Sequence, residues 1–127
     1  MKTLIAFLIL LGVTACSVSP SRAIAHADFT RDNVFGGAIV SQAAGKTFNT
    51  DRKALERILF ALDRITDPKR SVGEPTHLIT LYKGSSFESQ KLKIVVDATG
   101  EGYFKQGAGR EVQFYSDELK QLMKSYK

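Results

Sequence analysis

THLITLYK (residues 76–83) and KLKIVVD (residues 91–97) are the stretches that decide the fold. In the second, Leu92, Ile94 and Val96 stand two residues apart, which is the spacing of one buried face of a β-strand. A Gly-Ser-Ser segment follows the first stretch, and such residues favour turns. Strands joined by short turns pair antiparallel, so the two stretches predict an antiparallel meander.

The residues on either side extend this meander. Tyr103–Lys105 and Glu111–Tyr115 are predicted as further strands, each preceded by a glycine-containing turn at residues 98–102 and 106–110. VFGGAIV at residues 34–40 allows two interpretations. It is either a short strand kinked at its glycines or an irregular segment that covers other elements.

Two amphipathic helices flank the meander. Apolar residues from Thr50 to Thr66 recur three and four positions apart, as on the buried face of a helix: Leu55, Ile58, Leu59, Leu62 and Ile65. Thr50 or Asp51 would cap its start, and the Asp67-Pro68 pair would end it, because proline disfavours helical backbone in the preceding residue.

The second helix would begin after Ser116 as its cap, with a buried stripe formed by Leu119, Leu122, Met123 and Tyr126. Sheet and helices together predict an α+β fold. We expect a small antiparallel sheet of three to four strands with both helices packed on one face, in a single domain over residues 28–127.

The N-terminal residues have the order of an export signal. Lys2 precedes an apolar run from Leu4 to Val13. This run of about ten residues is too short for a membrane-spanning helix, which needs about twenty. Val13-Thr14-Ala15-Cys16 follows. It resembles the lipobox of bacterial lipoprotein signal peptides.

The lipobox resemblance implies removal of residues 1–15 and lipidation of Cys16 by a diacylglyceryl thioether, with an added N-acyl chain such as palmitate in many bacteria. Residues 16–27 would then be a flexible tether. Serine at position 17, rather than aspartate, implies the periplasmic face of the outer membrane if the source is Gram-negative. Residues 54–126 are similar in spacing to small bacterial lipoproteins of unassigned function, which implies a fold and no functional residues.

Cleavage by an ordinary signal peptidase is the alternative way in which the signal peptide could be removed. Ala25-His26-Ala27 before Asp28 has the small-x-small form of its sites, and that cut would release a protein without Cys16. The apolar run ends near Val13, well upstream, and this spacing favours the lipobox.

The composition limits the kinds of functional site that the chain can form. Cys16 is the only cysteine, so the domain would have no internal disulfide, thiolate metal site or nucleophilic thiol. The formal net charge of +5 comes from basic residues spread along the chain, which does not favour nucleic-acid binding. The two histidines, His26 and His77, have no metal-ligand spacing, and His77 is interpreted as a surface or edge residue at a strand start.

Candidate catalytic groups are sparse. The Gly-x-Ser-x-Gly pattern of serine hydrolases is missing, and Asp97 and Glu101 form a carboxylate pair that flanks a turn. The glycines between residues 100 and 109 are interpreted as hairpin turns, because no helix start follows them as it does in a phosphate-binding loop. Lys105 and Arg110 beside these turns are a weak candidate anion site. We expect no enzyme activity, cofactor or metal.

Phe60 breaks the helical pattern, because it points away from the apolar stripe of its helix. Either the preceding segment covers it through Phe35 or Phe48, or it is an exposed anchor for a protein partner. The lipobox, the small single domain and the sparse catalytic groups together favour a membrane-tethered cell-envelope lipoprotein that acts as a non-catalytic protein-binding or accessory factor. The alternatives are lipid or small-molecule binding on the sheet face opposite the helices, indicated by Val95 and the tyrosines, and a small hydrolase.

Overall fold

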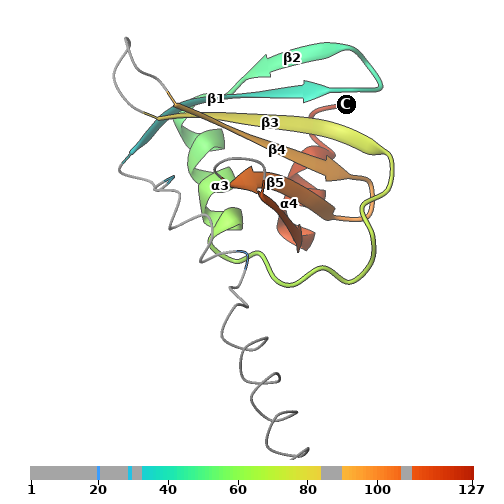
Figure 1. The fold of residues 1–127 in the computed structure, drawn as a ribbon. Helices are drawn as coiled ribbons and strands as arrows, with labels where there is room; N and C mark the ends of the chain where they lie inside the picture. The colour runs from blue at the N-terminus through green and yellow to red at the C-terminus, as the bar shows by residue number, and fades with distance from the viewer. Residues whose placement is uncertain (1–19, 21–28, 30–32, 84–89, 107–109) are drawn as a thin grey trace, which may run out of the picture.

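The computed structural model describes residues 33–83, 90–106 and 110–127, together with Pro20 and Phe29 (Figure 1). The predicted signal peptide, Cys16 and the rest of the predicted tether lie outside the described residues. The expectations about them therefore stay predictions from sequence. No helix among the described residues has the length and apolar character needed to cross a membrane.

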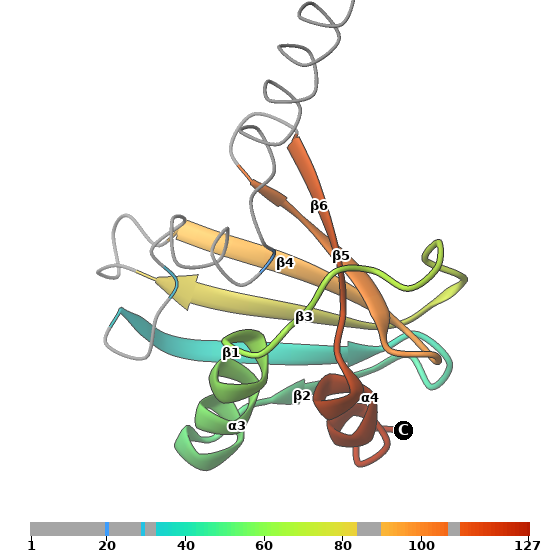
Figure 2. The same ribbon diagram turned by 90° about the horizontal axis from the view of Figure 1, so that it is seen from below.

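The fold is α+β, built on one antiparallel sheet of six strands in the order β2-β1-β3-β4-β5-β6. The strands are β1 (Val34–Ser41), β2 (Lys46–Asn49), β3 (Pro75–Lys83), β4 (Gln90–Asp97), β5 (Glu101–Gln106) and β6 (Arg110–Tyr115). Two helices, α3 (Arg52–Leu62) and α4 (Asp117–Met123), lie side by side on one face of this sheet (Figure 2).

The prediction of three to four strands was too small, because two strands precede α3. For residues 34–40 the strand interpretation is right, and the chain is irregular between Val34 and Gly36, where the register with β3 shifts. Gly37 has no side chain to separate β1 from the start of α3, and the Thr50 hydroxyl donates to its carbonyl at 2.9 Å. β2 was missed because Phe48 is its only apolar residue.

The helix α3 begins as predicted and ends early. The Asp51 carboxylate accepts a hydrogen bond from the Ala54 amide at 2.7 Å, which caps the exposed first turn. The helix ends at Leu62, whereas the apolar spacing predicted Thr66. The backbone of Thr66 instead pairs with that of Tyr115, with N–O distances of 3.0 and 2.9 Å. This contact with the edge strand β6 takes the chain out of the helix while Ile65 stays buried.

The C-terminal helix follows the prediction closely. The Ser116 hydroxyl caps α4 by accepting from the Leu119 amide at 3.1 Å. Leu119 and Met123 are buried, and Leu122 and Tyr126 are partly buried against the core.

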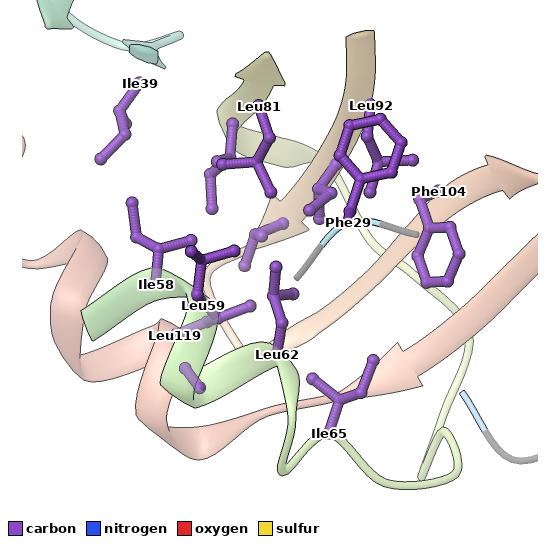
Figure 3. Close-up of a cluster of buried hydrophobic side chains, with 14 of the residues drawn as sticks. Phe29, Ile39, Ile58, Leu59, Leu62, Ile65, Leu81, Leu92, Phe104 and Leu119 are labelled. Atoms are coloured by element: carbon purple, nitrogen blue, oxygen red, sulfur yellow. The ribbon is translucent and has the colours of Figure 1, made fainter. Parts of the chain in front are cut away.

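One hydrophobic core lies between the sheet and the two helices (Figure 3). α3 contributes the buried stripe that the sequence predicts, including Ile58, Leu59 and Leu62. The sheet contributes inward-facing residues of β1 and of β3 to β6, and the ring centres of Phe104 and Phe114 are 6.1 Å apart. Phe29 reaches the same core from outside the sheet. Burial of these side chains, rather than helix or strand propensity, holds the layers together.

Candidate protein-binding groove

A groove of about 680 Å³ lies between α3 and α4 on the helical face. Its residues come from both helices and the chain just beyond α4: Lys53, Glu56, Arg57, Phe60, Asp117, Glu118, Gln121, Leu122 and Ser125. The groove forms because the two helices turn their apolar stripes to the sheet, which leaves their outer flanks facing each other.

Phe60 is the exposed aromatic residue of this groove, with 56% of its surface accessible. The Arg64 guanidinium lies 5.2 Å from its ring centre, and the same guanidinium pairs with Glu118 of α4 at 3.2 Å. The two residues that were expected to cover the Phe60 ring do not do so. Phe35 is itself 57% exposed, and Phe48 packs against Tyr126. The covered interpretation of Phe60 is therefore wrong.

The two walls of the groove carry opposite charges. Lys53, Glu56 and Arg57 give the α3 side a net positive charge, whereas Asp117 and Glu118 make the α4 side acidic. An apolar centre with a charged rim is the usual composition of a protein-protein interface, in which a few aromatic anchors supply most of the affinity. The sequence pointed to Phe60 but not to the acidic wall, because only tertiary packing brings α4 beside α3.

His77 differs from its prediction as a surface or edge residue. It is buried in β3, which pairs with β1 on one side and β4 on the other. Its Nε2 lies 2.8 Å from the Tyr126 carbonyl oxygen, which can only accept, so this nitrogen donates a proton to the bond. The ring thus fastens the C-terminal segment to the sheet.

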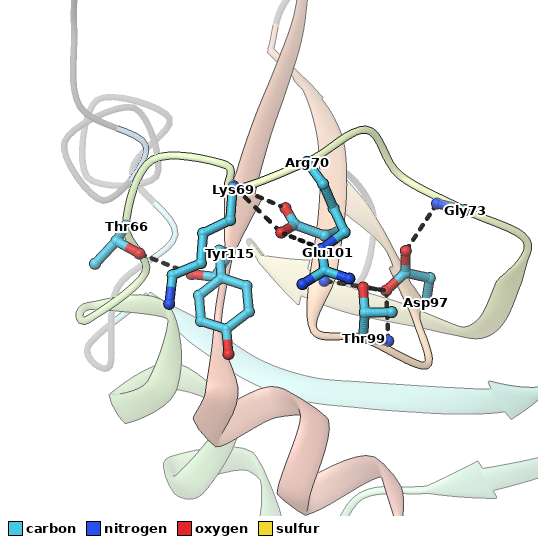
Figure 4. A network of polar contacts seen from close by, with 8 residues as sticks. All are labelled: Thr66, Lys69, Arg70, Gly73, Asp97, Thr99, Glu101 and Tyr115. Carbon is cyan, nitrogen blue, oxygen red and sulfur yellow. Dashed lines mark hydrogen bonds and ion pairs between the residues drawn. The ribbon is translucent and has the colours of Figure 1, made fainter.

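Both carboxylate oxygens of Asp97 accept hydrogen bonds. Oδ2 accepts from the Gly73 amide at 2.7 Å, and Oδ1 accepts from the Thr99 amide at 2.8 Å, the Thr99 hydroxyl at 2.7 Å and the Glu101 amide at 3.1 Å (Figure 4). Burial raises the pKa of this carboxyl, but the Thr99 hydroxyl and the three amides outweigh it, so the pKa lies below the ordinary value of 3.8. A stable carboxylate of this kind is suited to holding loops.

Glu101 was placed in a turn by the sequence, yet it begins β5 and its side chain is fully buried. Its two oxygens accept from the Lys69 amide at 3.2 and 3.4 Å, and Arg70 lies 4.0 Å away. With Asp97 it clamps the connection between α3 and β3 onto the sheet (Figure 4). The two carboxylates are thus arranged for structure: each is held by backbone amides.

The candidate anion site cannot be placed in full. Lys105 is exposed on β5 and Arg110 begins β6, but the side chain of Arg110 and the turn at residues 107–109 lie outside the described part of the chain. Within the described part of the chain, no group of three or more histidine, cysteine, aspartate or glutamate side chains is placed to hold a metal ion. The groove with Phe60 is therefore the strongest candidate site for a partner. No protein-family model matches the chain, and neither the curated proteins nor the solved structures contain a significant match to it.

Proposed function

We propose that this chain is a cell-envelope lipoprotein, tethered to the membrane by a lipid on Cys16, that acts as a non-catalytic protein-binding or accessory factor. The observation that carries the binding role is the exposure of Phe60 in the groove between α3 and α4. A large aromatic side chain kept in solvent has no stabilising role in the core, and its cost is repaid when a partner covers it.

The tether is supported by the sequence at residues 13–16. Two or three acyl chains hold a protein on a bilayer where one chain binds only marginally, because each buried methylene contributes about 0.8 kcal/mol. In a Gram-negative source, Ser17 favours the periplasmic face of the outer membrane. The partner of the groove would then be another protein of the cell envelope.

Phe60→Ala is expected to lower affinity for that partner by at least about 30-fold, the effect of an interface anchor worth about 2 kcal/mol. The unfolding free energy should fall by no more than about 1 kcal/mol, because only an exposed cation–π contact with Arg64 is lost. The measurement is site-specific photo-crosslinking in native cells from position 56 beside the ring, followed by mass spectrometry of the adduct and titration of the partner against each variant.

Phe35→Ala is the matched control, since Phe35 is equally exposed but lies on β1, outside the groove. It should leave the crosslink and the affinity unchanged. Equal binding by wild type and Phe60→Ala, or an equal loss in both variants, would contradict the groove as the binding site.

A further inference from the structure

The sheet face opposite the helices carries a strip of apolar side chains. Val40, Leu78, Val95 and Tyr103 are paired in one line across four adjacent strands, β1, β3, β4 and β5. All of these side chains are only partly buried. In the described part of the chain, both helices lie on the other face of the sheet (Figure 2).

Three lysines stand beside this strip. Lys91, Lys93 and Val95 are two residues apart on β4, so they share one face of the sheet. Continuing the register that pairs Val95 with Tyr103 and Ile94 with Phe104 places Lys93 next to Lys105 of β5. Residues side by side on neighbouring strands are about 5 Å apart, and residues two apart on one strand about 7 Å, so the three lysines leave the sheet from one small area. Like charges in such positions repel each other, which an anionic partner would relieve.

The other charges on this face offset only part of the cluster. Glu111 is the one exposed carboxylate among the described outward side chains of β3 to β6, and it is the direct partner of Lys105 in the register of β5 and β6. It offsets one of the three lysine charges and also accepts a hydrogen bond from the Gln113 side chain at 3.3 Å, which leaves the cluster with a net positive charge. Asp97 and Glu101 are buried under the α3–β3 connection. By contrast, the groove on the helical face has walls of both signs.

Tyrosines complete the pattern at the border between the apolar strip and the lysines. Tyr82 lies on β3 opposite Lys91, whose ammonium is 5.7 Å from the ring centre, and Tyr103 ends the strip beside Lys105. Tyrosine and lysine side chains have apolar bodies and polar tips, so both are suited to the boundary between lipid headgroups and acyl chains.

We infer that this outer sheet face docks on an anionic lipid surface, with Lys91, Lys93 and Lys105 on the headgroup phosphates and the strip from Val40 to Tyr103 at the level of the upper acyl chains. The inference rests on the charges and register of the sheet and is independent of the lipid on Cys16. It leaves the groove with Phe60 on the opposite face, turned away from the bilayer and open to a protein partner.

The test uses the full chain carrying Cys16→Ser, so that no acyl chain can attach. Its partition onto phosphatidylglycerol-containing vesicles is compared with partition onto pure phosphatidylcholine vesicles, which sets the background from the N-terminal apolar run. Each lysine near an anionic surface contributes about five-fold in affinity, so adding Lys91→Gln, Lys93→Gln and Lys105→Gln together should lower the preference for anionic vesicles by up to about 100-fold. High salt should abolish the same preference.

The matched control replaces Lys46, Lys124 and Lys127 by glutamine, which removes the same net charge from exposed positions outside the cluster. Preference for anionic vesicles retained in this control and lost in the first triple variant supports the docking face. Equal loss in both would mean unspecific attraction by net charge and would overturn the inference, as would no loss in either. Binding of inorganic phosphate at the three lysines, with no preference for anionic vesicles, would identify a small-anion site and would also overturn it.

Discussion

Gly102→Ala is expected to destabilise the protein by at least about 3 kcal/mol, because the site has no room for a methyl group. A Cβ at position 102 would lie against the Val95 carbonyl of the neighbouring strand and 2.6 Å from the Phe114 ring. The first contact is with backbone, and the second is with a fully buried ring packed on Phe104. To accommodate the added methyl group, β5 must therefore move away from β4, from Phe114, or from both.

The measurement is urea unfolding of wild type and variant. Gly36→Ala is the control, since Gly36 also lies in a strand but a Cβ there would meet only Tyr82 Cδ2, at 3.8 Å. It should be neutral or stabilising by up to about 1 kcal/mol, because alanine restricts the unfolded chain. Stability of Gly102→Ala within about 0.5 kcal/mol of wild type would show that β5 does not pack this closely against β4 and Phe114.

Asp97→Ala is expected to cost about 3 kcal/mol, because hydrogen bonds to a charged acceptor contribute about 1.5–3 kcal/mol each and do not add fully. The variant leaves the amides of Gly73, Thr99 and Glu101 without their acceptor. It should also speed hydrogen exchange at Gly73 and Lys69, because the α3–β3 connection loses one of its two carboxylate anchors. Asp67→Ala, an exposed change in the same connection, should have little effect on either quantity.

Asp97→Asn adds a pH signature. The folded pKa of Asp97 lies below its ordinary value of 3.8, so the carboxylate contributes stability above the unfolded pKa and loses it as the pH falls through the folded pKa. The difference in unfolding free energy between wild type and Asp97→Asn should therefore be constant from neutral pH down to about pH 5 and shrink below about pH 4. A difference that does not change with pH in acid would mean that the Asp97 contacts do not depend on its charge.

The elements with strong local periodicity were predictable. The apolar spacing of residues 55–65 and the alternation of residues 91–97 reflect one buried face, so α3 and β4 could be located from sequence alone. The caps Asp51 and Ser116 were predictable for the same reason, because a cap acts on amides only a few residues away. The whole sheet was not, since the short β2 has a single apolar residue and the glycines of β1 weaken its pattern.

Of the candidate site, only Phe60 could be predicted from the sequence. The position of Phe60 relative to the apolar stripe is a local property of the helix, so the helical spacing alone marks it as a candidate exposed aromatic residue. The other features depend on contacts between residues more than twenty positions apart in sequence. These features are the acidic wall from α4, the bond from buried His77 to Tyr126, and the bonds that Asp97 and Glu101 accept from the α3–β3 connection. Such contacts leave no periodic pattern.

The most direct test of the proposed function is intact mass spectrometry with membrane fractionation of the native protein beside Cys16→Ser. We predict that the native chain begins at Cys16, carries the mass of added acyl chains and sediments with the membrane. Cys16→Ser should remain unprocessed or leave the lipid-modified fraction. A native protein that is soluble and begins at Asp28 would contradict the lipid tether and identify a free exported protein.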